Sequence, residues 1–408
     1  MRYSILIMPA ISLTIILGGC YTKPAFVELQ GEVYKIGSAA CKTPEIVWEK
    51  TFGSGFHEDI AYSISSLRKG GFLLAGIRYG GEDDPRKERV YMSVIDDLGE
   101  VVWDSTFWYY LEPSGVLTAC EKMNGNLVLT GWTVEGGFFN GHLWEFDQTL
   151  HKVWDSNISK GGYYNIFSII PAADSGLIAV GETAAGEGAG FNTFAAKYNA
   201  SDRLQWVEYS QGKMNDGFYD VTEITGAGLA AAGYTNSWSQ GGEEDAYIVR
   251  MDNDGKNLWS AAFGGREEDE ALALCPANDG GFLLAGYSKS FGNRSEDIYI
   301  VKTNAQGKVI WENIYGADFN DRAYDIIPTD KGYLVAGYSE TGVFRETDFF
   351  VMEIDEQGKV LWENKFGYKN VGQARSIAKA SGGGYIIAGM TKPFYAKSDI
   401  YVVKLKLQ

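Results

Sequence analysis

The pattern that decides the fold lies in residues 281–311, which read GFLLAGYSKSFGNRSEDIYIVKTNAQGKVIW. The run 281–287 is apolar on both faces instead of alternating, as expected for a strand in a sheet that is covered on both sides. The run 297–303 comes after a longer loop, and the turn 304–307 leads into a third run that contains Trp311. Asn and Gly in that turn supply the positive φ that a tight hairpin needs.

The same unit begins earlier, with the run 271–275 and the turn 277–280, and it ends with the run 308–315. Each unit thus holds four strand-like runs, which we name A, B, C and D in chain order. The A–B and C–D connections are tight hairpins, whereas the B–C loop is longer. Four short antiparallel strands per unit, repeated radially, are typical of a β-propeller rather than a solenoid.

Two independent markers show how often the unit occurs. The first is a tryptophan that recurs at steps of 51 to 55 residues, as Trp48, Trp103, Trp154, Trp206, Trp259, Trp311 and Trp362. The second is an apolar run that ends in glycine, at 71–76, 126–131, 176–181, 228–233, 281–286, 332–337 and 384–389. Both markers recur seven times, which predicts seven blades. We expect the tryptophans to pack between adjacent blades, where a large aromatic side chain buries much area.

The two ends of the repeat region indicate how the ring closes. Residues 46–52 read as a strand of type D, and residues 399–407 read as type C. The seventh unit therefore lacks its own D strand, and the N-terminal strand can supply it. Closure of this kind leaves no open sheet edge between the first and last blades. The sequence thus predicts an all-β, seven-bladed β-propeller over residues 45–408.

Charge and cysteine content exclude some classes of function. The formal net charge is −17, and an acidic surface repels phosphate backbones, so nucleic acid is not an expected partner. Apart from Cys20, the cysteines are Cys41, Cys120 and Cys275, an odd number that cannot form a complete disulfide framework. No CxxC pair occurs, so a Cys/His zinc site has no support.

The N-terminus carries the features of an export signal. Arg2 precedes an apolar stretch, residues 5–17, that is too short to span a bilayer comfortably. Residues 17–20 read LGGC, which resembles the bacterial lipobox. That resemblance implies a signal peptide over residues 1–19 and diacylation of Cys20, and two acyl chains suffice for stable anchoring. The alternative is a short signal that happens to precede a cysteine.

Residues 20–44 then form a lipidated cysteine and a tether that leads to the propeller at residue 45. Residue 21 is tyrosine rather than aspartate. By resemblance to the sorting rule of some diderm bacteria, this favours the outer membrane over the inner one. The expected location is therefore the cell envelope, on a membrane that faces the periplasm or the exterior.

Residues 297–311 resemble the propeller repeats of many uncharacterised bacterial and archaeal surface proteins. The segments 255–259, 307–311 and 358–362 are also similar to the Gly-Lys-x-x-Trp end of the tryptophan-docking repeat in quinoprotein (PQQ-type) propellers. Quinoprotein dehydrogenases carry a vicinal cysteine pair and usually eight blades, which this sequence lacks, so a PQQ cofactor is not expected. An outer-membrane assembly lipoprotein with PQQ-like repeats is similar in kind, although its blades are shorter and more numerous, and this resemblance implies a scaffold role as one possibility.

Candidate ligand-binding residues gather where the D–A and B–C loops share one face. Asp59, Asp216, Asp269 and Asp321 each stand two residues before an Ala or Phe of strand A, and we expect them to encircle the mouth of the central channel. A ring of carboxylates can hold a divalent cation such as Ca²⁺ or attract a basic ligand. The alternative, that each aspartate accepts a backbone hydrogen bond at its own turn, is favoured by a comparable set of aspartates at the start of strand C.

The same face receives the long loops and many aromatic residues, among them Trp108, Trp132 and Trp238. Loops on a rigid scaffold are where function is usually placed, and aromatic rings beside carboxylates suit sugar rings or a polypeptide segment. No GxSxG, HExxH or phosphate-binding glycine loop marks a catalytic site.

The sequence therefore favours a monomeric, lipid-anchored propeller of the cell envelope that binds a protein or glycan partner. The alternative is an enzyme, either a glycan-active hydrolase or lyase or a quinoprotein-like oxidoreductase. Convergent carboxylates with perturbed pKa values in a deep mouth would mark the enzyme, and a broad aromatic surface would mark the binder.

Overall fold

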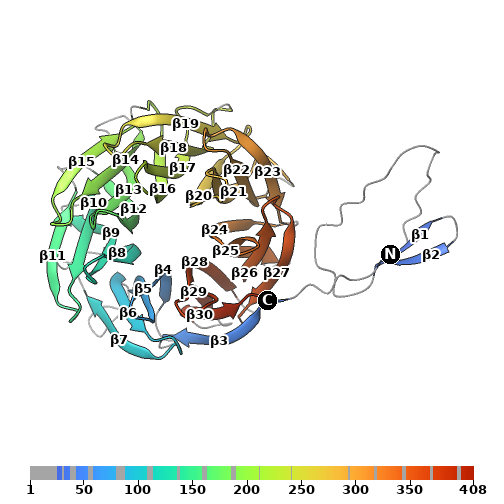
Figure 1. Ribbon diagram of the computed structural model, residues 1–408, viewed down its shortest axis with the longest axis horizontal. Helices are drawn as coiled ribbons and strands as arrows, with labels where there is room; N and C mark the ends of the chain where they lie inside the picture. The colour runs from blue at the N-terminus through green and yellow to red at the C-terminus, as the bar shows by residue number, and fades with distance from the viewer. Residues whose placement is uncertain are drawn as a thin grey trace.

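The computed structural model describes residues 25–29, 32–36, 43–53, 58–79, 88–107, 114–135, 138–158, 163–184, 190–210, 212–239, 241–292, 295–316, 319–341, 346–367, 371–392 and 397–408. Seven four-stranded antiparallel sheets surround a central opening as blades (Figure 1). The predicted all-β, seven-bladed propeller is confirmed.

Each blade runs from strand A at the centre to strand D at the rim. The A strands are β4 (Asp59–Ser66), β8 (Ser114–Glu121), β12 (Tyr164–Pro171), β16 (Asp216–Ile224), β20 (Asp269–Pro276), β24 (Asp321–Pro328) and β28 (Val371–Lys379). The B strands are β5 (Phe72–Tyr79), β9 (Leu127–Glu135), β13 (Leu177–Ala184), β17 (Gly228–Thr235), β21 (Phe282–Ser288), β25 (Gly332–Thr341) and β29 (Tyr385–Lys392). The C strands are β6 (Glu88–Ile95), β10 (Phe138–Phe146), β14 (Phe191–Tyr198), β18 (Asp245–Met251), β22 (Asp297–Thr303), β26 (Glu346–Asp355) and β30 (Asp399–Lys406). The D strands are β7 (Val101–Phe107), β11 (Lys152–Asn157), β15 (Leu204–Tyr209), β19 (Asn257–Phe263), β23 (Val309–Tyr315), β27 (Val360–Phe366) and β3 (Glu45–Phe52).

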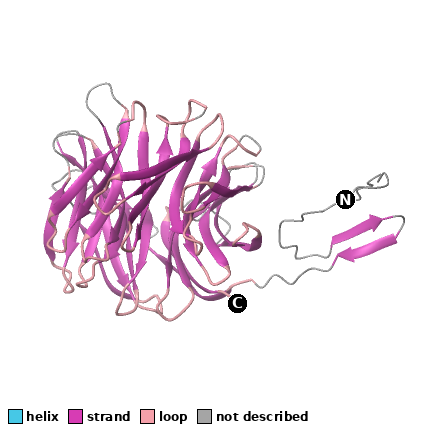
Figure 2. Ribbon diagram, turned by 45° about the horizontal axis from the view of Figure 1, so that its top comes forward, coloured by secondary structure: helices cyan, strands magenta, loops and turns pink. Residues whose placement is uncertain are grey.

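The ring closes as the sequence predicts. Strand β3 pairs antiparallel with β30 and is the outer strand of the seventh blade, in the sheet order β28-β29-β30-β3. It begins at the end of the propeller that carries the A–B and C–D hairpins, which we call the hairpin face (Figure 2). The opposite end, with the D–A and B–C loops, is the long-loop face.

The core is divided among the blade interfaces. The buried apolar side chains of the described residues form seven clusters, one between each pair of neighbouring blades. The B strands are buried on both faces, as in β21, in which every residue is buried. This burial explains why their sequence is apolar without alternation. Cys120 and Cys275 are free, buried core residues of two different clusters.

Trp48, Trp206, Trp259 and Trp311 dock on the C–D hairpin of the next blade. The indole N–H of Trp48 donates to the carbonyl of Asp97 at 3.0 Å, and that of Trp311 donates to Glu356 at 3.1 Å. Trp362 precedes the blade whose outer strand comes from β3, where no C–D hairpin exists, and it is buried instead. The inter-blade packing role predicted for these residues is therefore what the structure shows.

The second marker, the glycine that ends the B-strand run, faces a β-bulge in strand A. The A–B register shifts by one residue in every blade, as between Ala271 and Ala273. A Cβ atom at Gly286 would lie 1.9 Å from the carbonyl oxygen of Glu270. Five equivalent positions show the same clash, at 1.8 to 2.0 Å: Gly76, Gly181, Gly233, Gly337 and Gly389. Only glycine fits opposite the carbonyl that precedes the bulge.

Ahead of the ring, β1 (Ala25–Leu29) and β2 (Glu32–Ile36) pair antiparallel in a sheet of their own. The predicted signal peptide and Cys20 lie outside the described residues. Within the described ranges, no helix is long and apolar enough to cross a membrane.

Candidate functional site

The A strands surround the central opening (Figure 1). In each of them one half-buried residue lies at the β-bulge and is left out of the A–B register. Bulges re-aim side chains and are common beside functional sites. We call these residues the bulge ring: Tyr62, Leu117, Phe167, Tyr219, Leu272, Tyr324 and Arg375.

Contacts within the bulge ring run from blade to blade. The rings of Phe167 and Tyr219 lie 5.0 Å apart. The guanidinium of Arg375 lies 3.9 Å from the ring centre of Tyr324 and 5.6 Å from that of Tyr62. These contacts between adjacent A strands give the channel a mainly aromatic lining with one cation.

Three carboxylates meet on the long-loop face between blades four and five. One oxygen each of Glu244, Glu268 and Glu270 lies within 4.8 Å of the others, and we call this group the acidic wall. The backbone brings them together, because the N–H of Asp269 donates to the carbonyl of Glu244 at 2.7 Å. Oxygen ligands of this kind suit Ca²⁺. In the part of the chain that the structure describes, this is the one group of three or more such residues close enough to share a cation.

Two cations border the acidic wall but are already engaged. Lys289 lies 2.8 Å from Glu268, and the Tyr287 hydroxyl donates to the same carboxylate. Arg322 donates 2.6 Å to Glu296 and stacks 3.9 Å from the centre of the Tyr287 ring. Lys289 and Arg322 thus face the three carboxylates of the acidic wall and that of Glu296. This side of the mouth therefore keeps a net negative charge.

The pKa values show how the acidic wall responds to this crowding. Burial and the charges of Glu244 and Glu268 raise the pKa of Glu270 to about 7, against a hydrogen bond with Tyr287. Burial and the charge of Glu268 also raise the pKa of Glu244. Burial acts in the same direction on Glu268, but hydrogen bonds from Lys289 and Tyr287 outweigh it and lower its pKa. A cation bound at the wall would relieve this repulsion.

Aromatic hydroxyls extend the wall toward blade three. Glu182 accepts a hydrogen bond from Tyr234 at 2.8 Å and one from Asn165 at 3.0 Å. The rings of Tyr234 and Tyr219 lie 5.4 Å apart. Carboxylates next to aromatic faces form an environment that suits an ammonium or guanidinium group.

The four predicted aspartates lie at the first residue of their A strands and are buried, with 0 to 2% of their surface exposed. Asp216 accepts from Thr235 and Ser237, at 2.5 and 2.7 Å. Asp269 accepts from the N–H of Gly265 at 2.7 Å. Asp59 accepts from Arg78 at 2.9 Å, and Asp321 donates its N–H to the carbonyl of Glu296 at 2.6 Å. Their ligand-binding role stays a prediction. The backbone N–H groups of Ser237 and Gly265 donate to Asp216 and Asp269, which agrees with the alternative, in which the aspartate holds its own turn.

The predicted tryptophans have different environments. Trp238 follows β17 on the long-loop face, is 46% exposed and stacks on Tyr247 at 5.5 Å. Trp132 is half-buried in β9, directly after the glycine of its B strand. Tyr234 and Tyr287 hold the same repeat position in their blades. Trp108 lies outside the described residues.

The raised pKa of Glu270 predicts a pH dependence of stability. Its carboxyl is neutral in the fold up to about pH 7, whereas the unfolded group ionises near 4.5. The stabilisation is therefore present below pH 4.5 and is lost as the pH rises through about 7, by on the order of 2–3 kcal/mol. Urea unfolding at pH 5 and pH 8 should show a smaller loss of stability in Glu270→Gln than in the wild type. Glu267→Gln, an exposed neighbour, serves as the control, and an identical loss in all three proteins would contradict the assignment.

Comparisons with known proteins support the fold alone. No family model and no curated protein matches the chain. Among solved structures, a protein of unknown function from Dyadobacter fermentans is similar at 8% identity over 90% of this chain and 99% of that one, with a TM-score of 0.51. An acylaminoacyl peptidase from Pyrococcus horikoshii is similar at 14% identity over 85% of this chain and 51% of that one, with a TM-score of 0.50.

Proposed function

We propose that this protein is a lipid-anchored binding module of the cell envelope whose long-loop face captures a cationic segment of a partner protein. The acidic wall carries this proposal, because three carboxylates share one site with two raised pKa values. The predicted export signal and the lipobox-like LGGC at residues 17–20 support the location. A lysine or arginine side chain would neutralise the wall and lie against Tyr219, which is half-buried and interacts with Glu270 and Glu244.

The acidic wall predicts a charge-specific affinity for peptides. The protein should bind a tetralysine peptide, and Glu244→Gln should weaken binding about fivefold to tenfold, because one carboxylate of the cluster is lost. Titration calorimetry at low and high salt measures both the affinity and its screening. Glu363→Gln, an exposed position of the outer strand β27, is the matched control. Equal binding of tetralysine and its acetylated form would refute the proposal.

A second candidate is a glycan hydrolase, which the separation of pKa values within the wall supports. Glu270 has a pKa of about 7 and Glu268 a lowered one, which is the division needed for a general acid and a carboxylate partner. Their oxygens are close enough for the retaining geometry, in which the two carboxyl groups stand about 5 Å apart. Release of reducing ends from an envelope polysaccharide, abolished in Glu270→Gln, would favour this function over peptide capture.

A further inference from the structure

A second site lies on the hairpin face, between blades one and two, where the repeat departs from its own pattern. The C–D hairpins of four blades place a buried glycine with positive φ beneath the docking tryptophan: Gly99, Gly255, Gly307 and Gly358. At Gly99 a Cβ atom would lie 2.9 Å from the ring of Trp48, and at Gly307 it would lie 2.6 Å from that of Trp259. The indole thus rests directly on the glycine backbone.

In blade two the equivalent residue is Leu150, which keeps the positive φ, at 65°. A bulky side chain rarely adopts this conformation, and such strain tends to persist where function retains it. The side chains of Leu150 and Trp103 both pack against the core cluster between blades one and two. Together they line a partly open cavity of about 220 Å³.

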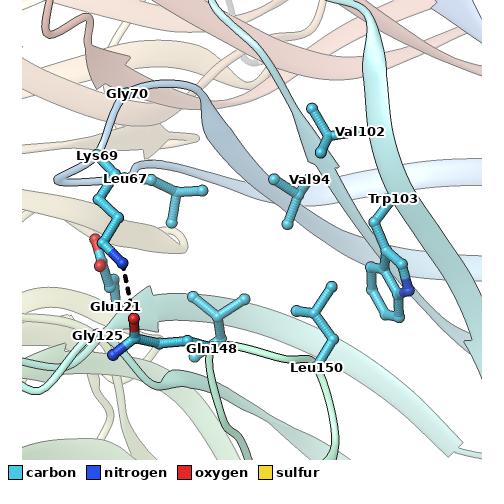
Figure 3. Close-up of a pocket in the computed structure, with 11 residues that line it drawn as sticks. Leu67, Lys69, Gly70, Val94, Val102, Trp103, Glu121, Gly125, Gln148 and Leu150 are labelled. Atoms are coloured by element: carbon cyan, nitrogen blue, oxygen red, sulfur yellow. Dashed lines mark hydrogen bonds between the residues drawn. The ribbon is translucent and has the colours of Figure 1, made fainter.

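Most of the residues that line this cavity are apolar, and polar side chains lie on one side of it (Figure 3). Trp103, Leu150, Val94 and Leu67 surround the space. On one side, the ammonium of Lys69 donates to the side-chain oxygen of Gln148 at 2.8 Å. The indole N–H of Trp103 makes no hydrogen bond within the described residues.

We propose that this cavity binds a flat aromatic molecule of about the size of indole, stacked against Trp103 with its polar substituent toward Lys69 and Gln148. An apolar cavity of about 150 Å³ is sufficient for benzene, so the larger space here suits a bicyclic ring. Trp103 supplies the aromatic face and Leu150 holds the hairpin apart. The site is independent of the acidic wall, which lies on the opposite face.

Indole is the probe for this site, with binding to the full chain measured by saturation-transfer NMR and calorimetry. The wild type should bind indole saturably. Leu150→Gly should weaken binding at least tenfold, because Trp103 would then settle on the hairpin as Trp48 does at Gly99. The matched control is Leu98→Gly, a 70% exposed leucine in the equivalent hairpin of blade one, which should leave binding unchanged.

Thermal unfolding separates loss of the site from loss of the fold. Leu150→Gly should stay folded with little change in melting temperature, because glycine adopts positive φ without strain and this gain offsets the lost contacts of Leu150 with the core. Val94→Phe, which fills the cavity without changing the hairpin, should also abolish binding. Absence of saturable binding to the wild type, or equal binding by a folded Leu150→Gly variant, would overturn the proposal.

Discussion

A chain that begins at Gly53 will fail to form a stable ring. Removing β3 strips β30 of its antiparallel partner and takes Trp48 and Phe52 from the core between blades seven and one. The exposed edge of β30 then becomes a template for aggregation. We expect destabilisation by more than roughly 5 kcal/mol, comparable to the whole stability of many domains.

Circular dichroism melts and size-exclusion chromatography measure this loss. A chain that begins at Thr43 keeps β3 and is the matched control, which should melt at the temperature of the full chain. If both truncated chains unfold at the same temperature, the closure by β3 does not contribute to stability as described.

Gly286→Ala should destabilise the propeller strongly, as should alanine at the equivalent glycines of the other B strands. The new methyl group would lie 1.9 Å from the Glu270 carbonyl, and backbone on both sides must move to admit it. Overpacking of this kind costs about 2–4 kcal/mol. Because Glu270 belongs to the acidic wall, the same substitution should also weaken tetralysine binding.

Urea denaturation compares this variant with Gly382→Ala. A Cβ atom at Gly382 meets nothing within 4 Å, so this control should change stability by less than about 0.5 kcal/mol. Equal stability of the two variants would show that strand A relaxes around the bulge at little cost.

The architecture was predictable because its two markers have simple physical causes. The tryptophan spacing follows from docking on successive hairpins, and the glycine spacing follows from the bulge that each B strand must accommodate. The closing strand was predictable from residues 46–52 and 399–407, and the structure extends it by one residue, to Glu45.

The mouth was harder to predict because side chains alternate along a strand. Asp269 was expected at the mouth of the channel, and it is buried there and accepts from Gly265. Its two neighbours, Glu268 and Glu270, supply two of the three carboxylates of the acidic wall. Successive residues of a strand point to opposite faces, so placing a residue one position off along the strand assigns its side chain to the wrong face. A usable signal was present after the B-strand glycine, where Glu182, Tyr234 and Tyr287 interrupt an otherwise apolar pattern.

The position of β3 also determines from which face of the propeller the N-terminal segment leaves. The strand begins on the hairpin face, beside Asp97 of blade one, so the segment that leads back to Cys20 leaves from that side. If Cys20 carries the predicted lipid, the chain would lead to the bilayer from the hairpin face, and the acidic wall would lie on the face away from that exit. The two proposed sites would then have different surroundings. The acidic wall would bind partners from solution, and the cavity beside Trp103 would bind small aromatic molecules near the membrane surface.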